Sequence, residues 1–167
     1  MVVTAIATAL LLSACGTSPY IPTEYPLRSG LISTITVKGQ TKITNSQLIG
    51  DPVIVFSATG IGKRSSDLRS ITEIMVQQAN KELDKAAQRT GGGSKIIELK
   101  VNSLVSEHAS YHFNSTLNFE AKLGNGEVIT KTVLHTSGFL LQDLNGCIAE
   151  SVMTLLNDKN LRAYLSQ

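Results

Sequence analysis

The sequence predicts an α+β fold: a mainly antiparallel sheet of about four strands, with two amphipathic helices on one face and an N-terminal hairpin. Three observations lead to this prediction. Apolar and polar residues alternate with a period of two in several segments, apolar residues recur every three or four positions in two others, and glycine-rich turns separate them. Elements that are apolar on one side pack as two layers around one core.

The first predicted strands form the N-terminal hairpin. Residues 31–38 and 41–49 alternate apolar with polar residues, and the Gly-Gln pair between them suits a two-residue turn. A glycine, an aspartate and a proline at 50–52 end this pattern. Residues 52–58 are then a continuous apolar run rich in β-branched residues, which is typical of a buried strand.

Two segments have the periodicity of amphipathic helices. The first spans about 66–89, where an apolar stripe lies opposite a polar side. The Ser-Ser-Asp run at 65–67 offers capping side chains at its start, and three glycines at 91–93 would end it. The second helix spans about 143–156, and a short apolar turn follows it.

Three further strands are predicted between the helices. Residues 95–105, 110–123 and 127–137 alternate strictly, which predicts a sheet that is covered on one face only. Gly-Asn-Gly at 124–126 predicts a hairpin turn between the last two strands. The strand at 52–58, the long helix and the strand at 95–105 could form a right-handed crossover, which would make those two strands parallel.

The N-terminal residues carry the most specific motif. An apolar stretch over 2–12 is followed by Ser-Ala-Cys, with the cysteine at position 15. A short apolar segment that ends in small residues is typical of a secretory signal, and about 11 residues are too few to span a bilayer. Signals of this kind usually begin with Lys or Arg, yet no charged residue precedes Glu24. The alternative is that residues 1–14 form an ordinary buried strand or helix.

The Leu-Ser-Ala-Cys run at 12–15 resembles the bacterial lipoprotein signal, in which a leucine and two small residues precede an invariant cysteine. This resemblance implies that the thiol of Cys15 receives a diacylglycerol and that cleavage makes Cys15 the new N-terminus. The chain would then divide into a signal peptide (1–14), a lipidated cysteine with an extended proline-rich tether (15–30) and a single periplasmic α+β domain (31–167).

Cys147 is the second of two cysteines. An acylated Cys15 leaves Cys147 unpaired, and the apolar helical pattern around Cys147 predicts that it is buried. A disulfide between Cys15 and Cys147 is the alternative, and the mass of the mature protein would distinguish the two.

Composition argues against nucleic acid as a partner. The net charge is +2 and no segment carries a run of like charges, whereas phosphate-binding surfaces need clustered Lys and Arg. There is no Trp and aromatic residues make up 5% of the chain, which is too few for a base-stacking platform. The sequence favours neither a monomer nor an oligomer.

The segment 58–65 lies between a strand and a helix, as a phosphate-binding loop would. A P-loop needs a glycine where the chain has Ser57 and a Ser or Thr where it has Arg64, and a dinucleotide fingerprint needs a glycine or alanine where it has Ser65. We therefore interpret the segment as a basic loop that leads to a capped helix.

Histidine and acidic residues likewise form no recognisable site. His108 and His112 are four apart in a predicted strand, hence about 13 Å from each other, which is too far for one metal ion unless the strand bends. His135, on another strand, could approach one of them. No Ser, His and acid set has a local signature, so we expect no catalytic residue, no metal and no cofactor.

Over about residues 52–165 the chain resembles a group of small Gram-negative envelope lipoproteins, namely the YajG-type lipoproteins, the lipopolysaccharide-assembly lipoprotein and the auxiliary lipoproteins of lipid-transporting ABC systems. The resemblance rests on the long helix after a buried strand, the hairpin at 124–126 and the ending at 155–161. The hairpin at 31–49 departs from the group's usual pattern. Gly16, in place of aspartate after the cysteine, resembles outer-membrane sorting with the domain facing the periplasm.

These features together predict a non-enzymatic outer-membrane lipoprotein that binds another envelope component, such as a β-barrel, a secretion or motility complex or a lipid-transport machine. The expected contact surfaces are the basic loop and the polar face of the sheet. Their residues are Lys63, Arg64, Glu98, Lys100, Asn118, Glu120 and Lys122. The alternative is a binder of a small ligand, lipid or glycan, held between sheet and helices. An envelope hydrolase is the third possibility and would need a cluster of Ser, His and Asp.

Overall fold

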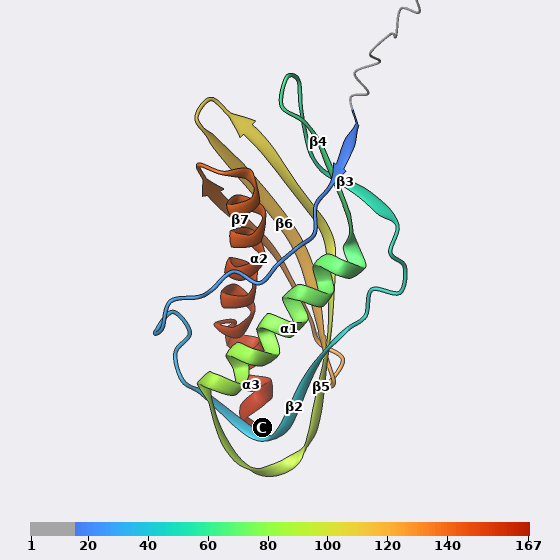
Figure 1. Ribbon diagram of the computed structural model, residues 1–167. Helices are drawn as coiled ribbons and strands as arrows, with labels where there is room; N and C mark the ends of the chain where they lie inside the picture. The colour runs from blue at the N-terminus through green and yellow to red at the C-terminus, as the bar shows by residue number, and fades with distance from the viewer. Residues whose placement is uncertain (1–15) are drawn as a thin grey trace, which may run out of the picture.

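The computed structural model describes residues 16–167, which form one seven-stranded sheet and three helices (Figure 1). The expected signal peptide and Cys15 lie outside the described residues. The strands are β1 (Thr17–Pro19), β2 (Ile35–Asn45), β3 (Pro52–Ala58), β4 (Gly62–Asp67), β5 (Ala87–Ala109), β6 (His112–Leu123) and β7 (Val128–Ser137). The helices are α1 (Leu68–Ala86), α2 (Leu140–Leu156) and α3 (Lys159–Ser166).

The sheet is mixed, so the prediction of a mainly antiparallel sheet of about four strands is wrong. The strand order is β1-β4-β3-β5-β6-β7, and β2 pairs with β5 beside this path. Three pairs are parallel (β1–β4, β2–β5 and β3–β5) and three are antiparallel (β3–β4, β5–β6 and β6–β7). The sequence analysis missed β1, β4 and the glycine-rich start of β5 because these segments do not alternate apolar with polar residues. Pairing with neighbouring strands, rather than their own propensity, makes them strands.

The predicted N-terminal hairpin is also wrong, because β2 continues unbroken through Gly39 and pairs in parallel with β5. Gly39 has a φ of +86°, and the register of the pair shifts there. A Cβ on Gly39 would lie 1.9 Å from the carbonyl oxygen of Gly93, so the two backbones can approach this closely only because residue 39 is glycine. The three glycines at 91–93 therefore belong to β5, and α1 ends before them at Ala86.

Other local predictions are confirmed. The crossover from β3 through α1 to β5 makes those strands parallel, with Phe56 opposite Ser106. The β6–β7 hairpin turns at 124–126, where the Gly126 amide donates to the carbonyl of Leu123. The carboxylate of Asp67 caps α1 by accepting from the Ser70 amide.

The helices lie on one face of the sheet, and no helix among the described residues covers the opposite face (Figure 1). Contacts of α1 with β2 and β5, and of α2 with β6 and β7, form the core. Its largest fully buried side chains include Phe56, Ile71, Met75, Leu99 and Phe119. Burial of these apolar side chains stabilises the two layers against each other.

The segment between β1 and β2 runs across α1 and α2 (Figure 1). The Tyr20 ring is 3% exposed and its hydroxyl donates to the Asn145 side chain at 2.7 Å. The amide nitrogen of the Gln78 side chain donates to the carbonyl of Tyr25 at 2.6 Å, and Arg162 donates to the carbonyl of Ser33 at 3.0 Å. Much of the segment assigned to the tether thus packs on the helices.

Candidate functional site

Lys63 and Arg64, two of the expected contact residues, lie in β4, next to the start of the described chain. Lys63 pairs in register with Thr17 of β1, and Arg64 with Ser18. Beyond them, the Asp67 carboxylate accepts from the amide and the hydroxyl of Ser70 at 2.7 and 2.6 Å. A carboxylate already occupies the N-terminus of α1, where a phosphate-binding loop would place its anion.

The hydrogen bonds at this cap also set the ionisation of Asp67. Its partial burial alone would raise the pKa of the carboxyl group. The bonds from the side chain and backbone of Ser70 outweigh that effect and hold the pKa below its ordinary value. Asp67 is therefore a charged structural cap at neutral pH.

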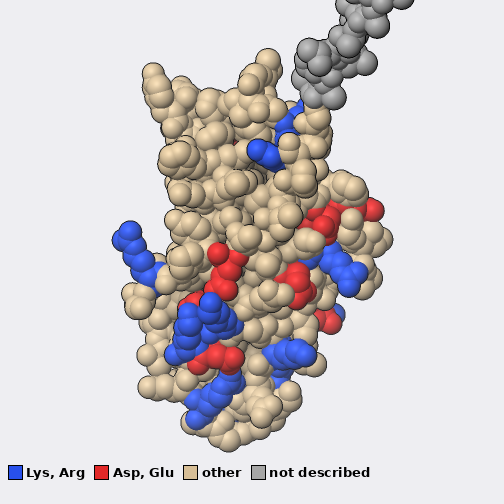
Figure 2. Space-filling view, in the orientation of Figure 1, with Lys and Arg blue, Asp and Glu red and all other residues tan. Residues whose placement is uncertain are grey.

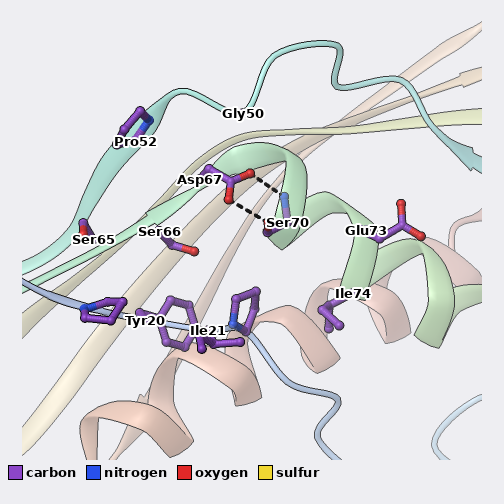
Figure 3. Close-up of a pocket in the computed structure, with 12 residues that line it drawn as sticks. Tyr20, Ile21, Gly50, Pro52, Ser65, Ser66, Asp67, Ser70, Glu73 and Ile74 are labelled. Atoms are coloured by element: carbon purple, nitrogen blue, oxygen red, sulfur yellow. Dashed lines mark hydrogen bonds between the residues drawn. The ribbon is translucent and has the colours of Figure 1, made fainter.

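A groove of about 570 Å³ opens beside this cap, between the segment 19–22 and the start of α1 (Figure 3). Figure 3 shows Tyr20 and Ile21 on one side and Asp67, Ser70 and Glu73 on the other. Its complete lining is Pro19, Tyr20, Ile21, Pro22, Gly50, Pro52, Ser65, Ser66, Asp67, Ser70, Glu73 and Ile74. An apolar floor with a few hydroxyl and carboxylate groups at the rim is a suitable composition for a small amphipathic ligand.

The uncovered face of the sheet brings together the other five expected contact residues. In register, Glu98 lies opposite Lys122 and Lys100 opposite Glu120 on β5 and β6. Their charged atoms are 3.6 and 3.8 Å apart. Asn118, on the same face, donates to Ser103 at 2.8 Å and accepts from Thr132 at 2.5 Å. These exposed pairs neutralise one another and contribute little to stability individually.

One polar cluster escaped the sequence analysis. Asp143 in α2 is fully buried, and its Oδ2 accepts from the hydroxyls of Ser106 at 2.9 Å and Ser115 at 2.5 Å. Its Oδ1 lies 3.0 Å from Nδ1 of His135. These partners come from β5, β6 and β7, so one carboxylate joins the helix to three strands. The sequence did contain one signal of this cluster: the alternation of apolar and polar residues places Ser115 and His135 on the inward face of their strands, where polar residues need partners.

The cluster contains Ser, His and Asp, but its connectivity differs from that of a nucleophilic triad. In a triad the serine hydroxyl bonds to the imidazole, and the acid orients the imidazole from behind. Here both serine hydroxyls bond to Asp143 and neither bonds to His135. Ser115 is also fully buried, which denies a substrate access to its oxygen. The arrangement suits a structural clamp.

Cys147 lies one helical turn beyond Asp143 and is fully buried, as the sequence predicted. Burial, with the negative charge of Asp143 adding to it, raises the pKa of its thiol to about 12. A thiol of this kind stays protonated at neutral pH and is a poor nucleophile.

His108 and His112 do not form a metal site. His108 tilts against the ring of Phe113 with 5.0 Å between centroids. Among residues 16–167, no group of three or more His, Cys, Asp or Glu side chains is placed to hold a metal ion. None of the helices in this part of the chain has both the length and the apolar composition needed to cross a bilayer.

Comparison with known proteins finds a similar fold. The crystal structure of protein XCC0632 from Xanthomonas campestris, family-model DUF330, superposes with a TM-score of 0.50 at 10% sequence identity. The match covers 89% of this chain and 96% of that one. At this identity the likeness concerns the fold alone. No family model matches the sequence, and a search of curated proteins gives no match.

Proposed function

We propose that the protein is a non-enzymatic outer-membrane lipoprotein whose domain binds another component of a cell-envelope complex. Cys15 would carry the lipid, and the domain would face the periplasm. The partner would be a β-barrel, a secretion or motility complex or a lipid-transport machine. One observation supports this proposal most strongly: a whole face of the sheet carries no helix among the described residues, and five expected contact residues gather there.

The composition of this face supports a protein partner. On the same face, beyond Asn118 from the ion pairs of β5 and β6, lie exposed apolar side chains, with Val105 45% exposed and Leu134 71% exposed. In register, both flank Thr116 of β6, so they lie in one row across three strands. A surface that combines apolar area with satisfied polar groups is typical of protein–protein interfaces.

Photocrosslinking in intact membranes tests the contact. A photoreactive residue in place of Thr116 should yield a discrete adduct with one envelope protein. The test variant is the double substitution Glu98→Lys with Lys122→Glu, which keeps the cross-strand ion pair and reverses the charges offered to a partner. We expect the double variant to lose most of the adduct while unfolding at the same denaturant concentration. A chain that forms no adduct, or an adduct that the reversal leaves unchanged, contradicts the proposal.

The groove of Figure 3 favours one alternative, the binding of a small lipid or glycan. Native mass spectrometry of the gently extracted protein would then show a non-covalent mass that denaturation removes. Ile21→Glu, at a groove residue that is 76% exposed, should abolish this mass. Leu48→Glu is the matched control, because Leu48 is 86% exposed and lies outside the groove lining. An extract without any such mass contradicts this alternative.

A further inference from the structure

Three connections of the chain and the start of the described residues meet at one end of the domain. The registers place Thr17 beside Lys63, and the β3–β4, β5–β6 and β7–α2 connections follow from the same ends of their strands. Figure 1 shows these connections together at the upper end, where the described chain also begins. We call this the β1 end; it comprises residues 16–18, 58–64, 109–113 and 137–141.

Apolar side chains project from all three connections. Ile61 is 50% exposed, Tyr111 93%, Phe139 69% and Leu141 52%. A single exposed apolar residue is ordinary on a protein surface. Four of them on three separate connections at one end of the molecule indicate a surface that is covered in use.

The four segments of the β1 end carry a net positive charge. Lys63 and Arg64 are their charged residues and the segments contain no Asp or Glu, while exposed Glu107 of β5 lies level with Lys63 in the sheet. Figure 2 shows basic side chains beside the start of the chain and otherwise uncharged surface over this end, whereas the acidic side chains in this view lie over the middle and lower parts. Basic residues beside exposed apolar and tyrosine side chains suit the head-group region of an anionic bilayer.

The chain allows little distance between this end and Cys15. Gly16 alone separates Cys15 from Thr17, and two residues of chain span at most about 7 Å. Thr17 is already paired in the sheet, and Tyr20 is buried against α2. Acyl chains on Cys15 would therefore bring the β1 end, and no other part of the domain, to the membrane surface.

We propose that the β1 end is a second membrane contact, which places Ile61, Tyr111 and Phe139 in the head-group region of an anionic bilayer. The inference rests on the proposed function only in taking the lipid on Cys15 as what brings the bilayer to this end. It fixes the orientation of the domain. Strands β5 to β7 extend from the membrane surface into the periplasm, and the ion-paired residues of the uncovered sheet face lie farther from the membrane than the β1 end does.

The absence of tryptophan from the chain permits a direct test. Tyr111→Trp and Phe139→Trp each place one fluorophore at the β1 end of the full chain. Asn125→Trp is the control at the far end of β6, which is 12 residues long and so separates the positions by about 40 Å. The acylated proteins are reconstituted into vesicles of phosphatidylethanolamine and phosphatidylglycerol with brominated acyl chains.

We expect at least twofold quenching and a blue-shifted emission for Trp at 111 and 139, and neither change at 125. Equal emission at all three positions, with acylation confirmed by mass, overturns the second contact and leaves the lipid anchor standing. Quenching at 111 and 139 of a vesicle-bound chain that carries no acyl group supports the contact independently of the anchor. A blue-shifted emission of Trp at 111 and 139 in native envelopes, but not in vesicles of pure lipid, assigns the β1 end to a protein partner and overturns the proposal.

Discussion

The carboxylate of Asp143 links α2 to three strands of the sheet. It accepts hydrogen bonds from two serines and contacts His135, all without exposure to solvent. The sequence placed Asp143 only at the start of a helix, because its partners lie 8 to 37 residues away on three different strands. By contrast, the sequence included Asp67 among the capping candidates at 65–67, since a cap bonds to an amide three residues on.

Removing this acceptor should destabilise the domain. Asp143→Ala leaves the hydroxyls of Ser106 and Ser115 buried without their partner, and we expect a loss of about 3 kcal/mol in the free energy of unfolding. Asp143→Asn is the matched control, because it keeps an acceptor oxygen and should cost less. Urea unfolding followed by circular dichroism measures both. A loss under about 1 kcal/mol for the alanine variant would show that the cluster is not a clamp.

The thiol of Cys147 should be inert in the folded protein. With its pKa raised to about 12 by burial, it stays protonated at pH 8. We expect an aromatic disulfide reagent to leave Cys147 unmodified in buffer and to label it fully in 6 M urea. Fast labelling without urea would contradict the buried position of this residue.

At the scale of elements, helices were easier to predict than strand partners. A helix satisfies its backbone within itself, so its apolar stripe and capping residues suffice to locate it, and α1 and α2 lie within three residues of their predicted bounds. A strand needs a partner that its own alternation does not specify. Gly39 was therefore interpreted as a hairpin turn, although it lies within β2 at a close approach to β5.

Substitutions at Gly126 and Gly39, which have similar φ angles, distinguish the cost of backbone strain from the cost of a steric clash. Gly126→Ala places a Cβ at a φ of +92° with nothing within 4 Å, so we expect a cost of about 1 kcal/mol from the backbone alone. Gly39→Ala has a similar φ and in addition meets the Gly93 carbonyl, so it should cost at least about 2 kcal/mol more. Equal midpoints of thermal unfolding for the two variants would contradict the close pairing of β2 with β5.

The cap of α3 should make stability depend on acidity. Burial alone would raise the pKa of Asp158, but Lys131 at 2.8 Å and the amides of Asn160 and Leu161 lower it below 3.8. The stabilisation is therefore complete above about pH 5 and is lost as the pH falls through the lowered value. Asp158→Ala should cost about 1 kcal/mol or more at pH 7, and the difference from the native chain should shrink below pH 4. A difference that is constant from pH 7 to pH 2 would contradict this assignment.

At the scale of the whole molecule, the arrangement of surfaces could not be predicted from the sequence. The sequence placed Ile61 in a loop between a strand and a helix and Tyr111 at the start of a predicted strand, and only the mixed topology brings them to one end. The same topology places β1 two residues after Cys15, where composition alone predicted an extended tether. The polar contact residues of β5 and β6 were predicted correctly as one face, because alternation fixes which residues share a face.

This arrangement gives the proposed anchor a structural consequence. If Cys15 is acylated, the membrane lies at the β1 end and the uncovered sheet face is presented beside it to other envelope components. If Cys15 is not acylated, the basic and apolar β1 end has no membrane brought to it by the chain. The state of Cys15 is thus the premise of both the proposed function and the domain's orientation.

The intact mass of the mature protein from its native membrane tests that premise most directly. We expect a chain that begins at Cys15 and carries the additional mass of a diacylglyceryl group and an amide-linked fatty acid, with Cys147 as a free thiol. A chain that retains residues 1–14, or that has an unmodified Cys15 or a disulfide between Cys15 and Cys147, would contradict the account.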